Sequence, residues 1–410
     1  MPPRTPRPAA LTRLAAHVAL ALAVAACGGL AATSAPTPKP TSPAAGAATP
    51  VASGPLASEP TPTPLPPDPT PGGAGCDLPP LDVRVAQLLL AGVVGTAPTA
   101  ASLALVRSGV GGVLLLGSNL ESGPQVAALV AGLQAEAALP LVVAIDEEPG
   151  RIGRLARAGI IEGSPSARDL GKEPAATVRA TARRIGEALA KLGITTNLAP
   201  VLDVTGAAAG GVIGDRSFGS SPSVVTRAGD AFLAGLADAG IAGVGKHFPG
   251  HGETTVDSHT SLPKVGASLA TLRKRALPPF VAAIGAGVPA IMVGHLLVPA
   301  LDASRPASLS RAVIQGLLRD DLGFAGLVMA DDFGMGALDS WGDLPRRTEL
   351  AIAAGVDMAI VLDERAIPDV VAGLLDAVAE GRLPEARVDE AFLRVVRFKG
   401  LAGYEGCGTP

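Results

Sequence analysis

Short apolar segments alternate with longer amphipathic segments along most of the chain after residue 77. Eight of the short segments have the length and composition of β-strands: Leu88–Val94, Gly112–Leu116, Leu141–Asp146, Thr195–Val201, Ala242–His247, Ala290–His295, Leu327–Asp331 and Ala359–Leu362. Helical spacing of apolar positions marks the segments between them, including Glu173–Leu192, Pro222–Ala239, Ser268–Ala286 and Ser310–Leu322. Strands that alternate with helices favour a parallel sheet, and eight such units favour a closed (β/α)8 barrel of the TIM type. The pattern therefore predicts one α/β domain over residues 76–410.

Polar side chains follow several of the predicted strands. They are Asp146, Asn197 with Asp203 just beyond it, Lys246 with His247, His295, and Asp331 with Asp332. A single polar residue after a strand is usually a helix cap or a turn former. Five such endings, of types that bind hydroxyls or transfer protons, are more than capping requires. Because barrel enzymes carry their chemistry at the C-terminal ends of the strands, this pattern indicates an active site there.

The first 27 residues have the features of a signal peptide. Arginines precede an apolar segment, Leu14–Ala26, which is shorter than the about 20 residues that a transmembrane helix needs. The segment ends in the sequence VAAC at residues 24–27, which is similar to a bacterial lipobox. We expect cleavage before Cys27 and lipid attachment to its thiol, so that an exported protein is anchored to a membrane. The alternative is an ordinary signal peptide with a chance cysteine.

Residues 28–75 are dominated by Pro, Ala, Thr and Ser, with 13 prolines and almost no large apolar side chains. Such a segment cannot bury a core, so we expect an extended, disordered linker between the anchor and the barrel. The remaining cysteines, Cys76 and Cys407, lie at the two ends of the predicted domain. In an oxidising compartment they can form a disulfide that joins the ends of a closed barrel, and the alternative is two free thiols.

The charge and the aromatic content narrow the range of partners. A formal net charge of −4, without a run of Lys and Arg along any predicted helix, argues against nucleic-acid binding. Aromatic residues make up 2% of the chain, against 48% hydrophobic residues in all. The core must therefore consist of small aliphatic side chains, and a substrate pocket has few rings on which a long ligand could stack. The sequence indicates a small pocket for one terminal residue of a ligand.

The segment Lys246–Gly252, with the sequence KHFPGHG, is followed by Asp257, Ser258 and His259. Histidine has an ordinary pKa of about 6.5, which suits a group that donates a proton and later accepts one. Asp257 is placed to hold one imidazole nitrogen of His259 and to fix its tautomer. A metal site is the alternative, but Pro249 prevents the helical spacing that a zinc-binding helix needs. We therefore predict no metal and no cofactor.

A second catalytic candidate lies in the segment Val328–Met335, where an apolar strand ends in the pair Asp331 and Asp332. A carboxylate that remains ionised at the mouth of a barrel is suited to nucleophilic attack on an electrophilic carbon. The residues alone leave open which aspartate of the pair is the nucleophile.

These motifs together resemble glycoside hydrolase family 3, in its branch of single-domain bacterial β-N-acetylglucosaminidases. The resemblance runs from about residue 81 to residue 401 and leaves no room for a second α/β domain. It implies that Asp331 is the nucleophile and that Asp332 is structural. It also implies that Asp257 and His259 form a mobile acid/base dyad, and that Lys246 and His247 bind sugar hydroxyls.

Two further segments match this family. The segment Asp146–Arg154 resembles a block whose first Asp and last Arg, here Asp146 and Arg154, bind the sugar. Pro149 replaces a glycine of that block, which puts the course of the loop and the role of Arg154 in doubt. The resemblance also assigns Arg216 to the substrate. The alternatives are a helix-capping role for Asp146 and, for Arg216, a structural pair with Asp203 or another strand-end carboxylate.

The resemblance implies a retaining, exo-acting β-N-acetylglucosaminidase or β-N-acetylhexosaminidase that acts on peptidoglycan fragments or chitin-like oligosaccharides. Within enzymes, the alternatives are a β-N-acetylglucosaminide phosphorylase and a β-glucosidase-like enzyme. Outside enzymes, the alternative is a lipid-anchored sugar-binding protein. The expected partners are a carbohydrate substrate and, through the lipid anchor, a membrane.

Overall fold

The computed structural model describes residues 77–404, apart from 207–211, 253 and 255, together with Cys407. The predicted signal peptide and linker (1–27 and 28–75), with Cys27 and Cys76, lie outside these residues, so the structure does not test them. Cys407 is buried and disulfide-bonded. Within the described part of the chain, no helix is long and apolar enough to cross a membrane.

Eight parallel strands form a closed barrel in chain order, which confirms the predicted fold. The strands are β1 (Leu89–Gly92), β2 (Gly112–Leu115), β3 (Val142–Ile145), β4 (Thr196–Asn197), β5 (Ala242–Phe248), β6 (Ala290–Val293), β7 (Leu327–Ala330) and β8 (Met358–Val361). Almost every strand residue is buried, because a barrel strand packs against the interior on one face and against helices on the other. This explains why the strands appear in the sequence as continuous apolar runs.

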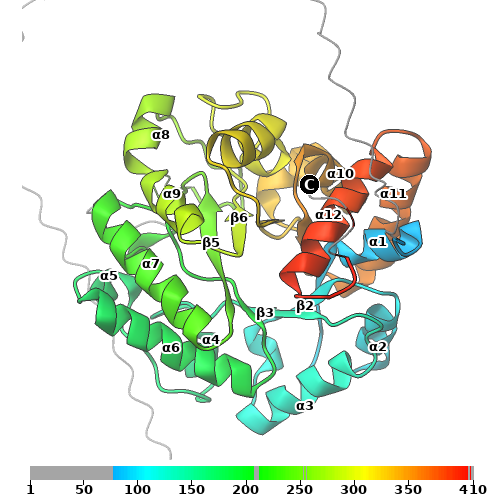
Figure 1. The fold of residues 1–410 in the computed structure, drawn as a ribbon, viewed down its shortest axis with the longest axis horizontal. Helices are drawn as coiled ribbons and strands as arrows, with labels where there is room; N and C mark the ends of the chain where they lie inside the picture. The colour runs from blue at the N-terminus through cyan, green and yellow to red at the C-terminus, as the bar shows by residue number, and fades with distance from the viewer. Residues whose placement is uncertain (1–76, 207–211, 253, 255, 405–406, 408–410) are drawn as a thin grey trace, which may run out of the picture. The chain divides into compact units, whose positions relative to one another are not determined.

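Helices surround the strands, as the ring of ribbons in Figure 1 shows. They are α1 (Leu81–Gln87), α2 (Ala100–Arg107), α3 (Gly123–Gln134), α4 (Arg154–Arg157), α5 (Ala167–Leu170), α6 (Ala175–Lys191), α7 (Pro222–Asp238), α8 (Leu269–Arg275), α9 (Pro278–Gly285), α10 (Leu344–Ala354), α11 (Ile367–Ala379) and α12 (Glu385–Phe398). The shorter elements are η1 (Gly117–Asn119), η2 (Gly214–Arg216), η3 (Ala307–Leu309), the π-helix η4 (Ala312–Asp321), η5 (Gly336–Trp341) and η6 (Glu364–Ala366).

The helix predicted over Ser268–Ala286 is two helices. α8 ends at Arg275, and α9 begins at Pro278 with proline in its first turn. The rings of Pro278 and Pro279 do not permit a continuous helix, because proline has no N–H to donate and its ring clashes with the carbonyl four residues before it. The first part, α8, lies beside the loop that follows β5.

The first and last helices of the barrel meet. Arg84 of α1 donates to Glu385 of α12 at 2.7 Å and also pairs with Asp389. Just past the end of α12, the Lys399 ammonium group donates to the Gln87 side chain at 2.5 Å. In Figure 1, α1 and α12 accordingly lie side by side at one edge of the ring. The first and the last helix of the barrel therefore close it together.

Candidate active site

Asp331 is the first residue after β7, and its backbone N–H donates to the carbonyl of Val293 on the neighbouring strand β6. Burial alone would raise the pKa of this carboxyl group. The charges of His247, His295 and Lys246 outweigh that effect and hold the pKa of Asp331 below its ordinary value. The carboxylate is therefore ionised at neutral pH, which is the state that nucleophilic attack requires.

The neighbouring Asp332 has a different environment. Its carboxylate accepts the backbone N–H of Leu362 at 3.1 Å, and its carbonyl oxygen lies 3.0 Å from Nε2 of His295. Burial raises the pKa of Asp332. The His259 imidazole, on a loop whose backbone accepts the N–H of Gly336, is one of the groups that oppose this rise. Asp332 thus holds the loop after β7 against the end of β8.

Carboxylates and cations alternate in a cluster at the mouth of the barrel. The Lys246 ammonium group, at the end of β5, lies 2.7 Å from Asp146 and 2.8 Å from Glu148. Arg216 donates two hydrogen bonds of 2.8 Å to Glu148, and Arg154 donates one of 2.9 Å to Asp146. The structure therefore brings together four residues that the sequence assigned to the substrate, with Glu148 at their centre.

Glu148 is the residue whose importance the sequence analysis missed. Its side chain is 1% exposed. Burial opposes its ionisation, but Lys246 and Arg216 more than offset this and hold the pKa of Glu148 far below its ordinary value. The sequence contained one signal, since Glu148 is the glutamate of the family block that begins at Asp146. Its partner Arg216 is 68 positions away, so the pairing was not visible.

The loop after β3, which contains Pro149, brings Arg154 back to Asp146. Glu147 forms a backbone bridge with Gly153, and its carboxylate accepts the N–H of Leu155 at 2.7 Å in the first turn of α4. Arg154 begins this helix and reaches back to Asp146. Burial raises the pKa of Glu147 to about 7. The two adjacent glutamates thus differ, because Glu148 has two cationic partners whereas Glu147 is held by backbone N–H groups.

Arg216 forms its ion pair with Glu148, three residues after the end of β3, and not with Asp203; of the structural pairs left open as the alternative role for Arg216, the structure thus contains the one with another strand-end carboxylate. Asp203 has different partners. Its carboxylate lies 2.7 Å from Nδ1 of His247 and accepts the backbone N–H of His251 at 2.6 Å. Because one nitrogen of His247 faces Asp203, the orientation of this imidazole ring is fixed. Asp203 therefore holds His247 of β5 and His251 of the loop that follows it.

The proposed acid/base dyad lies on that loop. Nδ1 of His259 is 2.8 Å from Asp257, which also accepts the backbone N–H of His259 at 3.0 Å. This N–H and the facing imidazole lower the pKa of Asp257. The side chains of His259 and Asp257 are 69% and 46% exposed. The structure thus brings Asp257 and His259 together at the surface of the mouth.

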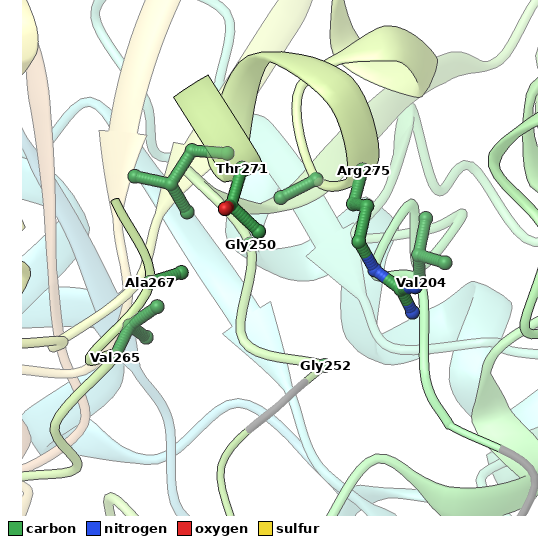
Figure 2. Close-up of a pocket in the computed structure, with 9 residues that line it drawn as sticks. Val204, Gly250, Gly252, Val265, Ala267, Thr271 and Arg275 are labelled. Carbon is green, nitrogen blue, oxygen red and sulfur yellow. The ribbon is translucent and has the colours of Figure 1, made fainter. Parts of the chain in front are cut away.

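The base of this loop passes over a small hollow beside α8. Figure 2 shows Gly250, Ala267 and Thr271 on one side of the hollow and Val204 with Arg275 on the other. Gly250 has a φ of +125°, which favours glycine, and a Cβ at Gly252 would lie 2.2 Å from the Val204 carbonyl oxygen. Both glycines are therefore required where the loop leaves the barrel.

No metal centre is apparent in the described residues: no group of three or more His, Cys, Asp or Glu side chains there can hold an ion. The histidines have other partners. His295 lies 2.7 Å from the Ser308 hydroxyl, and Nδ1 of His251 lies 2.8 Å from the Thr254 hydroxyl. The fold and the mouth cluster thus define a barrel enzyme whose site consists of carboxylates, cations and imidazoles.

Comparison with known proteins identifies the class. The model of the glycosyl hydrolase family 3 N-terminal domain matches residues 80–398. Because this match covers most of the chain, the protein is a glycoside hydrolase, and it belongs to family 3. The resemblance seen in the motifs is confirmed.

Individual relatives agree with this assignment. The chain is 40% identical over 338 residues to the β-hexosaminidase LpqI of Mycobacterium tuberculosis, covering 81% of this chain and 85% of that protein. A family 3 β-N-acetylglucosaminidase from a Paenibacillus species has a similar structure, with a TM-score of 0.75 and 36% identity over 79% of this chain; the chain spans 62% of that one. A family 3 hydrolase from Mycobacterium smegmatis has a TM-score of 0.72 and 40% identity, covering 79% of this chain and 98% of that chain.

Proposed function

We propose that this protein is a retaining β-N-acetylhexosaminidase that removes one terminal N-acetylglucosamine residue at a time. β-Hexosaminidase relatives at about 40% identity and the family 3 barrel support the reaction class. Peptidoglycan fragments and chitin-like oligosaccharides are the substrates that we propose.

The mechanism is a double displacement. Asp331 attacks the anomeric carbon while the bond to the leaving oxygen breaks and His259 donates its proton to that oxygen. His259 then takes a proton from water, which attacks the anomeric carbon and releases Asp331 as a free carboxylate. The observation that carries the proposal is the position of Asp331, directly after β7 at the mouth where Lys246 joins Asp146 and Glu148. The lowered pKa of Asp331 agrees with it.

The substrate-binding roles follow from the mouth cluster. Asp146 and Lys246 retain hydrogen-bonding capacity beyond their mutual contact, since a carboxylate accepts several bonds and an ammonium group donates three. Sugar hydroxyls can both donate to Asp146 and accept from Lys246. We therefore assign the hydroxyl contacts to Asp146, Lys246, His247, Arg154 and Arg216.

The test is turnover of 4-methylumbelliferyl β-N-acetylglucosaminide by the purified protein. Asp331→Asn should lower kcat at least about 10³-fold, and His259→Ala about 10²-fold to 10⁴-fold, because they remove the nucleophile and the general acid. Asp320→Asn, at an exposed position on η4, is the matched control and should retain wild-type rates. Wild-type rates in Asp331→Asn or His259→Ala would refute the role of that residue.

A phosphorylase differs from a hydrolase only in the molecule that accepts the glycosyl group. A neutral imidazole such as that of His259 repels an incoming phosphate less than a carboxylate base would. We expect the same rate with and without added inorganic phosphate, and N-acetylglucosamine rather than its 1-phosphate as the product. A sugar-binding protein without activity would bind N-acetylglucosamine but release no 4-methylumbelliferone.

We further propose that the enzyme is exported and anchored to a membrane by a lipid on Cys27. The arginines, the apolar segment and the VAAC sequence at residues 24–27 support this localisation. Wild-type protein should incorporate labelled acyl chains in cells and fractionate with membranes. Cys27→Ser should do neither, and labelling that persists in this variant would contradict the proposal.

A further inference from the structure

The loop that carries the acid/base dyad is hydrogen-bonded to the segment that follows the nucleophile. The backbone N–H of Gly336 donates to the carbonyl of His259 at 3.1 Å, and that of Ala337 donates to the carbonyl of Ser258 at 3.1 Å. Both donors belong to η5, five and six residues after Asp331. We call these two bonds the η5 latch.

The segment between Asp331 and η5 is itself fixed to the barrel. The Phe333 N–H donates to the carbonyl of Ile360 on β8 at 3.0 Å. The Arg347 guanidinium, on α10, donates to the carbonyl oxygens of Phe333 at 3.1 Å and Gly342 at 2.7 Å, on either side of η5. The latch therefore connects the His259 loop to η5, and the contacts of the residues flanking η5 with β8 and α10 fix its position relative to Asp331.

The dyad needs such a connection because its side chains provide little contact with the barrel. They are largely exposed, and their mutual hydrogen bonds fix the imidazole relative to Asp257 but not relative to Asp331. The far end of the loop is attached elsewhere, where the Val265 N–H donates to the carbonyl of Leu297. Among the described contacts, the η5 latch is the one that joins the His259 backbone to the nucleophile segment.

Gly336 permits the close approach. A Cβ at this position would lie 2.9 Å from the His259 carbonyl oxygen and 3.0 Å from that of Thr260. A Cβ atom essentially never lies within 3.0 Å of a heavy atom to which it is not bonded. The atoms that it would meet here belong to the backbone, which cannot rotate away as a side chain can. Gly336 does not have a positive φ, so alanine fits its own backbone conformation. An alanine there would therefore displace the dyad backbone without straining η5.

We infer that Gly336 is a positioning residue for the general acid/base: the η5 latch sets the distance between His259 and the sugar bound at Asp331. The inference rests on the proposed roles of these two residues. It concerns proton transfer in both half-reactions and not the attack by Asp331. The loss of activity caused by weakening the latch must therefore be larger for leaving groups that need more protonation.

The test compares Gly336→Ala with wild type on aryl β-N-acetylglucosaminides whose leaving groups differ in pKa. With 4-methylumbelliferone, kcat/KM should fall about 10-fold to 100-fold, within the range that general acid catalysis contributes. With 2,4-dinitrophenol, which leaves without protonation, kcat/KM should change less than about 3-fold. Azide, which needs no general base, should restore the deglycosylation rate of the variant.

Gly316→Ala is the matched control, because a Cβ at Gly316, on η4, would meet nothing within 4 Å. It should match wild type on both substrates. Equal losses of Gly336→Ala on the two substrates would overturn the inference, since they indicate damage to Asp331 or to the fold. Wild-type behaviour on both would overturn it as well. An inactive wild type would instead refute the proposed function.

A second variant covers the case in which Gly336→Ala does not fold. Replacing Ala337 with the corresponding α-hydroxy acid, by nonsense suppression, removes only the N–H that donates to Ser258 and adds no volume. The same dependence on the leaving group is expected, with a loss of about 3-fold to 10-fold for 4-methylumbelliferone. Unchanged kinetics in this ester variant would overturn the inference.

Discussion

Both ends of the barrel bury clusters of charge, and the clusters are built differently. At the N-terminal end, Asp357 precedes β8 and is 0% exposed. Arginines from the surrounding helices donate to it: Arg319 and Arg387 at 2.6 Å and Arg394 at 3.3 Å. At the mouth, the charges come from strand ends and loops, and the side chains of Asp146 and Arg154 are 18% and 26% exposed.

The difference separates the charges that we expect to serve stability from those to which we assign substrate binding. At the N-terminal end, Asp357 accepts arginines from η4 and α12, so it fastens the outer helices to the barrel. At the mouth, Asp146 and Arg154 remain partly accessible, as the proposed contacts with sugar hydroxyls require. This division agrees with the general organisation of TIM barrels, in which one end serves stability and the other serves function.

The largest expected effect is on stability, at the N-terminal end. Asp357→Asn should lower the free energy of unfolding by about 3–5 kcal/mol, because it leaves three buried arginines without their shared anion. The folded fraction should keep the wild-type kcat. Urea unfolding measures the first quantity and active-site titration with a mechanism-based inhibitor the second. If Asp357→Asn lost activity without losing stability, the proposed distinction between a stabilising N-terminal end and a binding mouth would be wrong.

The same aspartate predicts a pH dependence. Its arginine partners hold the pKa of Asp357 below its ordinary value despite complete burial. A carboxyl group whose pKa is lower in the folded state adds stability above its unfolded pKa of about 3.9, and that stability is lost as the pH falls through the folded value. Wild-type stability should therefore fall more steeply below pH 4 than that of Asp357→Asn.

The next largest effect is expected at the mouth. Glu148→Gln should reduce kcat/KM about 10²-fold, equivalent to about 2.7 kcal/mol, with a smaller loss of stability than Asp357→Asn. Without the Glu148 charge, Lys246 and Arg216 compete for Asp146 and withdraw it from the sugar. Michaelis constants and urea unfolding measure the two effects. An unchanged KM with a large loss of stability would show that Glu148 is structural, like Asp357.

The smallest effect returns to the N-terminal end. Lys399 is half-buried and donates to the Gln87 side chain, and burial lowers its pKa to about 7. The unfolded chain thus binds more protons than the folded protein between about pH 7 and pH 10, and stability should rise with pH in that range. Lys399→Met should add about 1–2 kcal/mol at pH 7 and abolish this rise. Differential scanning calorimetry at pH 7 and pH 9.5 checks both.

The sequence predicted the barrel because each strand is a local apolar run, and all eight predicted runs contain or overlap an observed strand. Local proline chemistry, overlooked in the prediction, divided α8 from α9. The mouth was predictable in part, because motifs identify Asp331, Lys246 and the dyad residue by residue. The partner of Arg216 was not predictable, because Glu148 meets Arg216 only when folding brings the end of β3 next to the loop after β4. No local pattern marks Asp357 or its arginines, since α12 meets β8 only in the folded barrel.

The contact between α1 and α12 has a consequence for engineering the protein. Since Arg84 bonds to Glu385 and pairs with Asp389, the beginning and the end of the barrel are already neighbours. A short peptide joining residues 78 and 402 would leave the order of strands around the barrel intact. New termini can then be opened in the exposed turn after α6, and this circularly permuted enzyme should fold and retain its active site.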